Sequence, residues 1–236
     1  MIGGVVEAGE MTRAMVMVHT GFRREFGLMH QLVGGAFDGD RVRAGAIADH
    51  IELMDMVLEA HHTAEDKLIW PRLLERCPEE IRPLVHGMES QHERIHGLLD
   101  DLTKGIAAWR ADASGKHRES VSRTIDDLVP LLDEHLGMEE QYVLPLIEKH
   151  ITAEEWGALA AEQGSHFPAE KRPLILGMMM YEGAPAAVRE MLGSLPGEVR
   201  PIIEEAAPRD YGDYAEHVYG TRTPPYGSTL HKRASA

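Results

Sequence analysis

Four long segments of the chain carry apolar residues spaced alternately three and four positions apart, the pattern of a helix with one buried face. They run from Met15 to Val33, Ile47 to Leu68, Met88 to Trp109 and Val121 to Leu146. Short stretches rich in glycine, proline and serine separate them, and no segment shows the strict alternation of a β-strand. This pattern predicts an all-α fold, an up-down-up-down four-helix bundle.

The bundle is expected to occupy residues 1–150, and the rest of the chain, residues 151–236, a helical C-terminal appendage. Beyond residue 150 the apolar segments shorten, and they predict additional short helices at 153–163, 171–181, 185–192 and 198–206. From Pro208 onwards the sequence is rich in Tyr, Gly and Pro, which predicts an irregular tail.

The net charge of the chain restricts the kinds of partner that it can bind. It has 39 acidic and 24 basic residues and a net charge of −15, which repels phosphate backbones and anionic membranes, so we expect no nucleic acid and no membrane as a partner. No apolar run approaches the ~20 residues that span a bilayer, and the first residues lack the pattern of a signal peptide. The single Cys77 excludes an internal disulfide and favours a reducing compartment. We therefore expect a cytoplasmic protein.

Two segments repeat the same residue types in the same order. They are His61-x-x-x-Glu65 followed by Pro71, and His135-x-x-x-Glu139 followed by Pro145. In each, the Pro comes six residues after the Glu, and a second acid directly follows the Glu. Residues four apart lie on the same face of a helix, about 6 Å apart at Cβ. Each segment can therefore present one imidazole and one carboxylate to the same point.

The predicted core faces are apolar except at one level, where His or Glu replaces an aliphatic residue. Burying an unpaired carboxylate or imidazole costs several kcal/mol, so something must compensate for it. Imidazoles with carboxylates suit first-row transition metals. The candidate metal ligands at this level are His19, His61, Glu65, His92, His96, His135 and Glu139.

Seven protein ligands are too many for one ion, so we predict a centre of two Fe ions with an oxo or hydroxo bridge. One iron is assigned His92, His96 and His135. The other is assigned His19 and His61, and Glu65 and Glu139 are expected to bridge the pair. The iron with two imidazoles is then one ligand short, and this open position is where a small molecule is expected to bind.

A third His-x-x-x-Glu pattern, His166 to Glu170, is the weaker candidate: it is not assigned to the ligand set, and contact of His166 with the metal stays an open alternative. It contains Pro168, which is typical of a helix start rather than of a ligand pair within a helix. His62 and Asp66 adjoin candidate ligands in the sequence, but they are expected to point away from the buried stripe.

In this order, the candidate ligands resemble the hemerythrin superfamily, specifically the hemerythrin-like (HHE cation-binding) proteins. The match covers about residues 12 to 148 and reads His, His-x-x-x-Glu, His-x-x-x-His, His-x-x-x-Glu. The resemblance implies a four-helix bundle with a non-haem di-iron centre. The chain departs from the small oxygen carriers, which have Asp five residues after the last His and lack the appendage with its Met178–Tyr181 segment. These departures argue against reversible oxygen storage, and the Met178–Tyr181 segment is a candidate cover for the site.

We therefore expect a reaction with a small oxidant, namely hydrogen peroxide, nitric oxide or O₂, at the open iron position. Detoxification of the catalase or peroxidase type fits a site enclosed in a bundle, because it needs no organic substrate pocket. This would make the protein a di-iron oxidoreductase. Tyr142, three residues after Glu139, is a candidate catalytic residue that could donate a hydrogen bond or an electron; its simpler role is that of a core aromatic.

Two alternatives remain. The first is reversible binding or sensing of O₂ or NO without turnover. The second is a ferritin-like di-iron protein, because Glu59-x-x-His62 and Glu89-x-x-His92 match the Glu-x-x-His motif of that fold. Both motifs fall on adjacent predicted helices, however, and the other two helices present His in place of a lone Glu.

Overall fold

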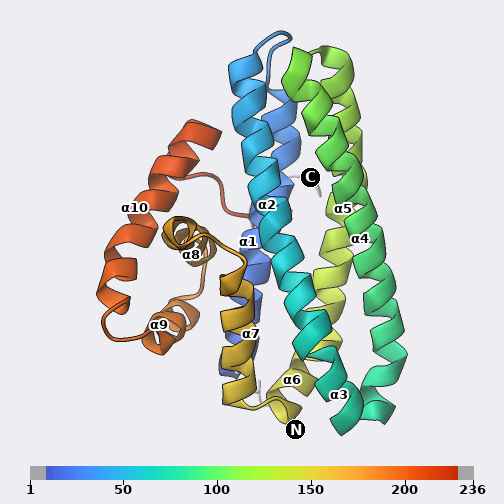
Figure 1. Cartoon of the computed structure of the whole chain (residues 1–236), viewed down its shortest axis with the longest axis vertical. Helices are drawn as coiled ribbons and strands as arrows, with labels where there is room; N and C mark the ends of the chain where they lie inside the picture. The colour runs from blue at the N-terminus through green and yellow to red at the C-terminus, as the bar shows by residue number, and fades with distance from the viewer. Residues whose placement is uncertain (1–8, 228–236) are drawn as a thin grey trace, which may run out of the picture.

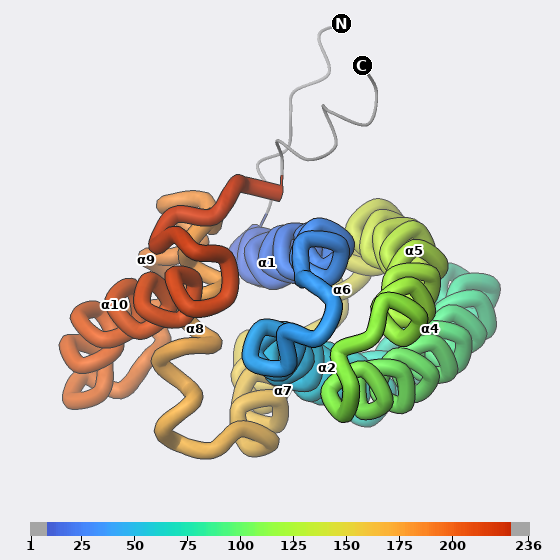
Figure 2. Tube along the Cα trace, turned by 90° about the horizontal axis from the view of Figure 1, so that it is seen from above, coloured from blue at the N-terminus to red at the C-terminus, as the bar shows by residue number. Residues whose placement is uncertain are grey.

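The computed structural model describes residues 9–227, and all regular secondary structure within this range is helical. The four longest bundle helices are α1 (Glu10–Gly34), α2 (Arg41–Leu68), α4 (Pro78–Asp112) and α5 (Gly115–Met138). Successive helices run in opposite directions, and each packs on two neighbours, α1 and α4 both contacting α2 and α5 (Figures 1 and 2). The prediction of an all-α, up-down-up-down four-helix bundle is confirmed. Between residues 9 and 227, no helix has both the length and the apolarity required to cross a membrane.

Short, capped turns hold neighbouring helices antiparallel at one end of the bundle. Asp40 caps the start of α2 by accepting a hydrogen bond from the Arg43 backbone N–H at 2.9 Å. At the next turn Ala113 ends α4 in the left-handed conformation, with φ of 51°, and Ser114 caps α5 by accepting from the His117 backbone N–H. These caps satisfy helix-terminal groups that would otherwise have no partner.

The two repeated segments end in the same way at the opposite end of the bundle. The first leads into α3 (Trp70–Arg76), and the second passes through the π-helical segment η1 (Glu139–Val143) into α6 (Leu144–His150). Both short helices have a proline in their first two positions, Pro71 and Pro145, where the missing N–H has no intrahelical acceptor anyway. The sequence repeat is therefore also a structural repeat, and α3 and α6 contact each other (Figure 1).

The appendage consists of α7 (Ala153–Ser165), the short 3₁₀ segment η2 (Ala169–Lys171), α8 (Arg172–Met180), α9 (Pro185–Ser194) and α10 (Arg200–Tyr219). Helices α8 to α10 lie together on one side of the bundle, where α8 contacts α1 and α10 contacts α2 (Figures 1 and 2). Four helices lie near the predicted positions, but α10 continues through Pro208 to Tyr219, where an irregular tail was expected. Of that tail, residues 228–236 lie outside the described residues.

Buried polar contacts explain why the segment after Pro208 is helical. The Glu25 carboxylate of α1 is fully buried and accepts hydrogen bonds from the hydroxyls of Tyr211, at 2.8 Å, and Tyr219. Burial, and then the nearby Glu25 carboxylate, raises the pKa of Tyr219, which keeps its hydroxyl protonated and able to donate. His50 of α2 lies 3.1 Å from the same hydroxyl. Tertiary contacts thus order α10 beyond what its sequence pattern predicts.

The core is continuous between the bundle and the appendage. Met178 and Met179 of α8 belong to the same buried apolar cluster as Phe22 of α1. A Cβ added to Gly21 would lie 2.5 Å from the Met179 sulfur, so α8 approaches α1 closely at a position two residues from His19. The methionines predicted to cover the site therefore pack on the helix that carries one of the candidate ligands.

Gly177 allows the backbones of α8 and α10 to approach each other, and Gly177→Ala is expected to separate these helices. A Cβ at Gly177 would lie 2.0 Å from the backbone oxygen of Ala207 and 2.7 Å from its carbonyl carbon. Overpacking of this kind costs about 1–3 kcal/mol, so the free energy of unfolding should fall by about that amount in urea titrations. Gly193→Ala on α9 is the control, because a Cβ there meets nothing within 4 Å. Equal stability of the two variants would contradict this packing.

Candidate metal centre

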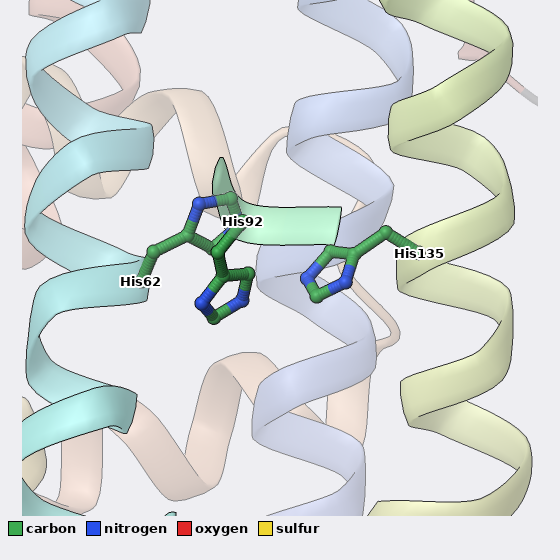
Figure 3. A group of neighbouring side chains, drawn as sticks. All are labelled: His62, His92 and His135. Atoms are coloured by element: carbon green, nitrogen blue, oxygen red, sulfur yellow. The ribbon is translucent and has the colours of Figure 1, made fainter. Parts of the chain in front are cut away.

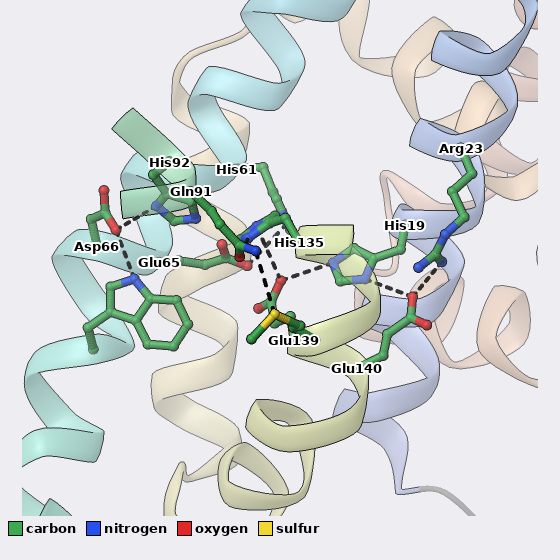
Figure 4. A network of polar contacts seen from close by, with 12 residues as sticks. His19, Arg23, His61, Glu65, Asp66, Gln91, His92, His135, Glu139 and Glu140 are labelled. Atoms are coloured by element: carbon green, nitrogen blue, oxygen red, sulfur yellow. Dashed lines mark hydrogen bonds and ion pairs between the residues drawn. The ribbon is translucent and has the colours of Figure 1, made fainter. Parts of the chain in front are cut away.

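Seven buried His and Glu side chains from all four walls of the bundle meet at one level, and Figure 4 shows six of them. They are His19 on α1, His61, His62 and Glu65 on α2, His92 on α4, His135 on α5 and Glu139 at the start of η1. None is more than 7% exposed. The π-helical turn of η1 begins at the last of them, and such turns often occur at functional sites.

Six of the seven side chains form two groups, each with three potential ligand atoms within 4.8 Å of one another. The first group is His62, His92 and His135 (Figure 3). The second group is His19, His61 and Glu139. Within the first group the rings of His62 and His92 stack, with their centroids 4.1 Å apart. The bundle therefore offers two adjacent positions with the donor atoms that a metal ion requires.

The carboxylates lie between the imidazoles of the two groups. Glu139 Oε2 is 3.4 Å from His19 Nε2 and 3.9 Å from His135 Nε2, so it approaches both groups. Glu65 Oε1 lies 3.1 Å from His61 Nε2. Burial, and then the adjacent Glu139 carboxylate, raises the pKa of Glu65 well above its ordinary value. A cation placed among these groups would offset the repulsion between the two carboxylates.

The cluster has many buried polar atoms without hydrogen-bond partners. Among the described residues, five imidazole Nε2 atoms and all four carboxylate oxygens of the cluster lack one. Leaving such atoms unpaired costs about 1–3 kcal/mol each, which metal coordination would remove. Burial, and then the neighbouring imidazoles, lowers the pKa of His61 and His62 and lowers that of His135 to about 3, so these rings are neutral, as metal ligation requires. The residues therefore fit a pair of metal ions.

The second acid of each repeat orients an imidazole from another helix. Asp66 accepts a hydrogen bond from His92 Nδ1 at 3.0 Å and a second from Trp70 Nε1 at 2.8 Å. These contacts direct the Nε2 atom of His92 inward, as in metal sites where a carboxylate fixes the tautomer of a ligating imidazole (Figure 4).

Glu140 has the same role in the second repeat. Its Oε1 lies 3.0 Å from His19 Nδ1, and Arg23 donates to that oxygen at 2.6 Å (Figure 4). Two further rings are held by amides: His135 Nδ1 lies 3.3 Å from Gln91 Oε1, and His61 Nδ1 lies 3.1 Å from the side-chain amide of Gln163. Because Gln163 belongs to α7, the appendage contacts a candidate ligand directly.

The structure brings six of the seven predicted ligands together and places the seventh, His96, at the surface. The His96 side chain is 60% exposed, and its Nδ1 lies 3.4 Å from Glu59 Oε2. His62, expected to point away from the core, is only 6% exposed and lies in the cluster instead. Adjacent helical residues point about 100° apart, so α2 can direct His61 towards one group and His62 towards the other. The presence of two adjacent histidines, His61 and His62, was the sequence signal from which this arrangement could have been predicted.

The remaining candidates lie outside the cluster. Tyr142 is in η1 and 46% exposed, so it is not a core aromatic, and the structure does not bring it into the cluster. The side chain of His166, at the end of α7, is 41% exposed and 3.8 Å from Glu162. The glutamates required by the ferritin-like alternative, Glu59 and Glu89, are also exposed, so they are not placed to bridge buried metals.

The fold and the site together define the class of this protein. It is an all-α bundle with buried His and Glu groups that could hold metal ions. Residues 10–147, more than half of the chain, match the hemerythrin HHE cation-binding domain, and the chain belongs to this family. The matched region runs from α1 into α6. The order of the motifs in the sequence indicated this family, and the match confirms it.

A relative has also been found among curated proteins. The chain is 26% identical over 98 residues to an uncharacterised hemerythrin-like protein of Schizosaccharomyces pombe. The alignment covers 42% of this chain and 44% of the relative, so it spans less than half of the length of either protein. No solved structure matches the chain.

Proposed function

We propose that the chain binds two iron ions inside the bundle and uses them to react with a small oxidant. This proposal rests mainly on nine imidazole nitrogens and carboxylate oxygens that are buried at one level and have no hydrogen-bond partner within residues 9–227. Nitrogen and oxygen donors suit first-row metals, and the family to which the chain belongs is named for cation binding.

The arrangement of these atoms supports a revised assignment of ligands. One iron is assigned His62, His92 and His135, and the other is assigned His19 and His61. Glu65 and Glu139 are assigned as bridges, because Glu139 approaches imidazoles of both groups and Glu65 lies beside it. As in the assignment from sequence, the iron with two imidazoles has one protein ligand fewer, which leaves a position for a small molecule.

Iron in these positions would supply a Lewis acid and an electron-transfer couple. The chain itself holds four of the five imidazoles by their Nδ1 atoms, and it keeps the residues of the cluster at most 7% exposed. On one side the phenyl ring of Phe22 lies 5.2 Å from the ring of His61, so the surroundings of the two-imidazole position are partly apolar. Small neutral molecules such as hydrogen peroxide, nitric oxide and O₂ fit such a site, whereas anionic oxidants are repelled by the net charge of −15.

Among these oxidants we favour hydrogen peroxide, with disproportionation as the reaction. Two molecules of hydrogen peroxide give one O₂ and two water molecules, so one peroxide is oxidised and the other is reduced. This reaction needs neither an organic substrate nor a separate reductant, which agrees with a site enclosed by four helices. Tyr142 has no assigned part in it, because its side chain lies at the surface.

Repeated additions of hydrogen peroxide to the iron-loaded protein are expected to release O₂ each time, at one O₂ for every two peroxides consumed. An oxygen electrode measures the yield, and the metal-free and zinc-loaded proteins serve as controls, since zinc has no redox chemistry. A stable complex of the reduced protein with O₂ or NO that is reversed by removing the gas, without peroxide turnover, would favour the alternative of reversible binding or sensing.

A further inference from the structure

A cleft of about 580 Å³ opens between α2 and α4 and leads from the surface to the candidate metal centre. Its walls carry four carboxylates, those of Glu59 and Asp66 on α2 and of Glu89 and Glu93 on α4. Within the described part of the chain, no Lys or Arg lines this cleft. A cleft with one sign of charge and low-dielectric walls concentrates ions of the opposite sign.

The inner end of the cleft is formed by two imidazoles of the candidate metal centre. His62 and His92 both line it, although they are only 6% and 7% exposed. The Nε2 atom of each is buried and has no hydrogen-bond partner among the described residues. The cleft therefore connects solvent to the three-imidazole group.

A second pair of donor groups lies nearer the surface on the same two helices. His96 Nδ1 is 3.4 Å from Glu59 Oε2, and the two side chains are 60% and 53% exposed. Along α2, Glu59 is one turn from His62, and along α4, His96 is one turn from His92, which places each outer residue about 6 Å from its inner neighbour at Cβ. The helices thus present an outer imidazole–carboxylate pair beside an inner pair of imidazoles. Thr63, which also lines the cleft, donates to Glu59 at 3.4 Å.

We propose that this cleft is the route by which divalent cations reach the buried centre, and that Glu59 and His96 bind a hydrated cation transiently at its outer end. The proposal rests on the metal centre assigned above. The structure places His96 at the surface. The proposal gives this residue a function in the uptake of the metal instead of in its final coordination. The four carboxylates speed capture by attraction, and the outer pair passes the cation one helical turn inward to His62 and His92.

The test measures the rate of metal uptake separately from the amount bound. The metal-free full-length protein is mixed with Co²⁺ in a stopped-flow instrument, the visible absorbance of bound Co²⁺ gives the rate, and metal analysis after dialysis gives the stoichiometry. Glu59→Gln/Glu93→Gln is expected to slow uptake about 10-fold or more at low salt and to bind the same final amount as the wild type. At 1 M salt the Debye length is about 3 Å, so most of this difference should disappear.

The control is Glu119→Gln/Asp127→Asn, which removes two exposed charges from α5, away from the cleft, and should leave the rate unchanged. His96→Ala should slow uptake without lowering the final stoichiometry, and circular dichroism checks that each variant is folded. Equal rates in the wild type and the cleft variant, or equal slowing in the α5 control, would overturn the route. So would loss of bound Co²⁺ at equilibrium in the cleft variant. Failure of the wild type to bind Co²⁺ at all would overturn the proposed centre and the route together.

Discussion

Glu65→Gln is expected to reduce bound iron from two ions per chain to one or none, while making the metal-free protein more stable at neutral pH. The first effect follows from the loss of a charged bridging ligand between two cations. The second follows from the environment of Glu65, a carboxyl group that is fully buried beside the carboxylate of Glu139. Metal analysis of the purified, iron-loaded variant measures the first effect.

The sign of the stability effect follows from the pKa of Glu65, which is raised in the folded protein first by burial and then by Glu139. The folded state then holds this proton more tightly than the unfolded state does. The metal-free wild type therefore loses stability as the pH rises above the unfolded-state value of about 4.3, by about 1.4 kcal/mol per pH unit until the folded-state pKa is reached. Gln has no such proton, and its amide oxygen can accept a hydrogen bond from His61 Nε2, which lies 3.1 Å from Glu65 Oε1.

Urea unfolding of the metal-free proteins should therefore show little difference between variant and wild type at pH 4. At pH 7 the variant should be more stable, by about 1–3 kcal/mol. Glu119→Gln on the exposed face of α5 removes the same charge and should change neither the stability nor the metal content. Retention of two irons by Glu65→Gln would refute the bridging assignment. A variant that is less stable than the wild type at pH 7 would show that the two carboxylates do not repel each other in the folded protein.

His62→Ala is expected to lower the affinity of one metal position by more than about 100-fold, since loss of an outer hydrogen-bond partner alone costs 10- to 100-fold. His96→Ala is the matched variant on the facing helix and should retain two ions at equilibrium. The expectation rests on burial, because the His62 side chain lies in the cluster whereas that of His96 is 60% exposed. Competition with a chelator, followed by metal analysis, gives the two affinities.

The reverse outcome, with metal lost from His96→Ala and kept by His62→Ala, would support the ligand spacing read from the sequence and contradict the order seen in the structure. Equal loss in both variants would mean that α4 contributes two ligands and α2 three. Because His62→Ala also creates a cavity beside His92, the thermal unfolding of both metal-free variants should be compared first. A folded metal-free His62→Ala protein makes the loss of metal attributable to the missing ligand.

The helical periodicity and the repeated His-x-x-x-Glu segments were sufficient to predict the bundle and most of its buried cluster. Six of seven candidate ligands meet because residues four apart share a helix face and because successive antiparallel helices of the bundle bring their polar levels side by side. The acids after each Glu, Asp66 and Glu140, were visible in the repeat, but their partners were not. Each hydrogen-bonds an imidazole on a different helix, at 3.0 Å, a contact between residues far apart in the sequence.

The appendage was the least predictable part of the chain. Its short helices follow local apolar patterns, but α10 continues through Pro208 because Tyr211 and Tyr219 donate to a buried glutamate of α1. The contact of Gln163 with His61 is also tertiary, since an isolated glutamine in a polar helix gives no sequence signal.

The sequence by itself determined the all-α class, the four-helix topology and the level at which the candidate metal ligands interrupt the core, since these follow from local periodicity and from the cost of burying polar groups. Only the tertiary structure decided that His62 faces the cluster and His96 the solvent. The reason is rotational, because successive side chains on a helix point about 100° apart. The packing of α2 and α4 on their neighbours sets the rotation of each helix about its axis, and this rotation decides which side chains face the cluster. The same packing decided which surface opens into the acidic cleft.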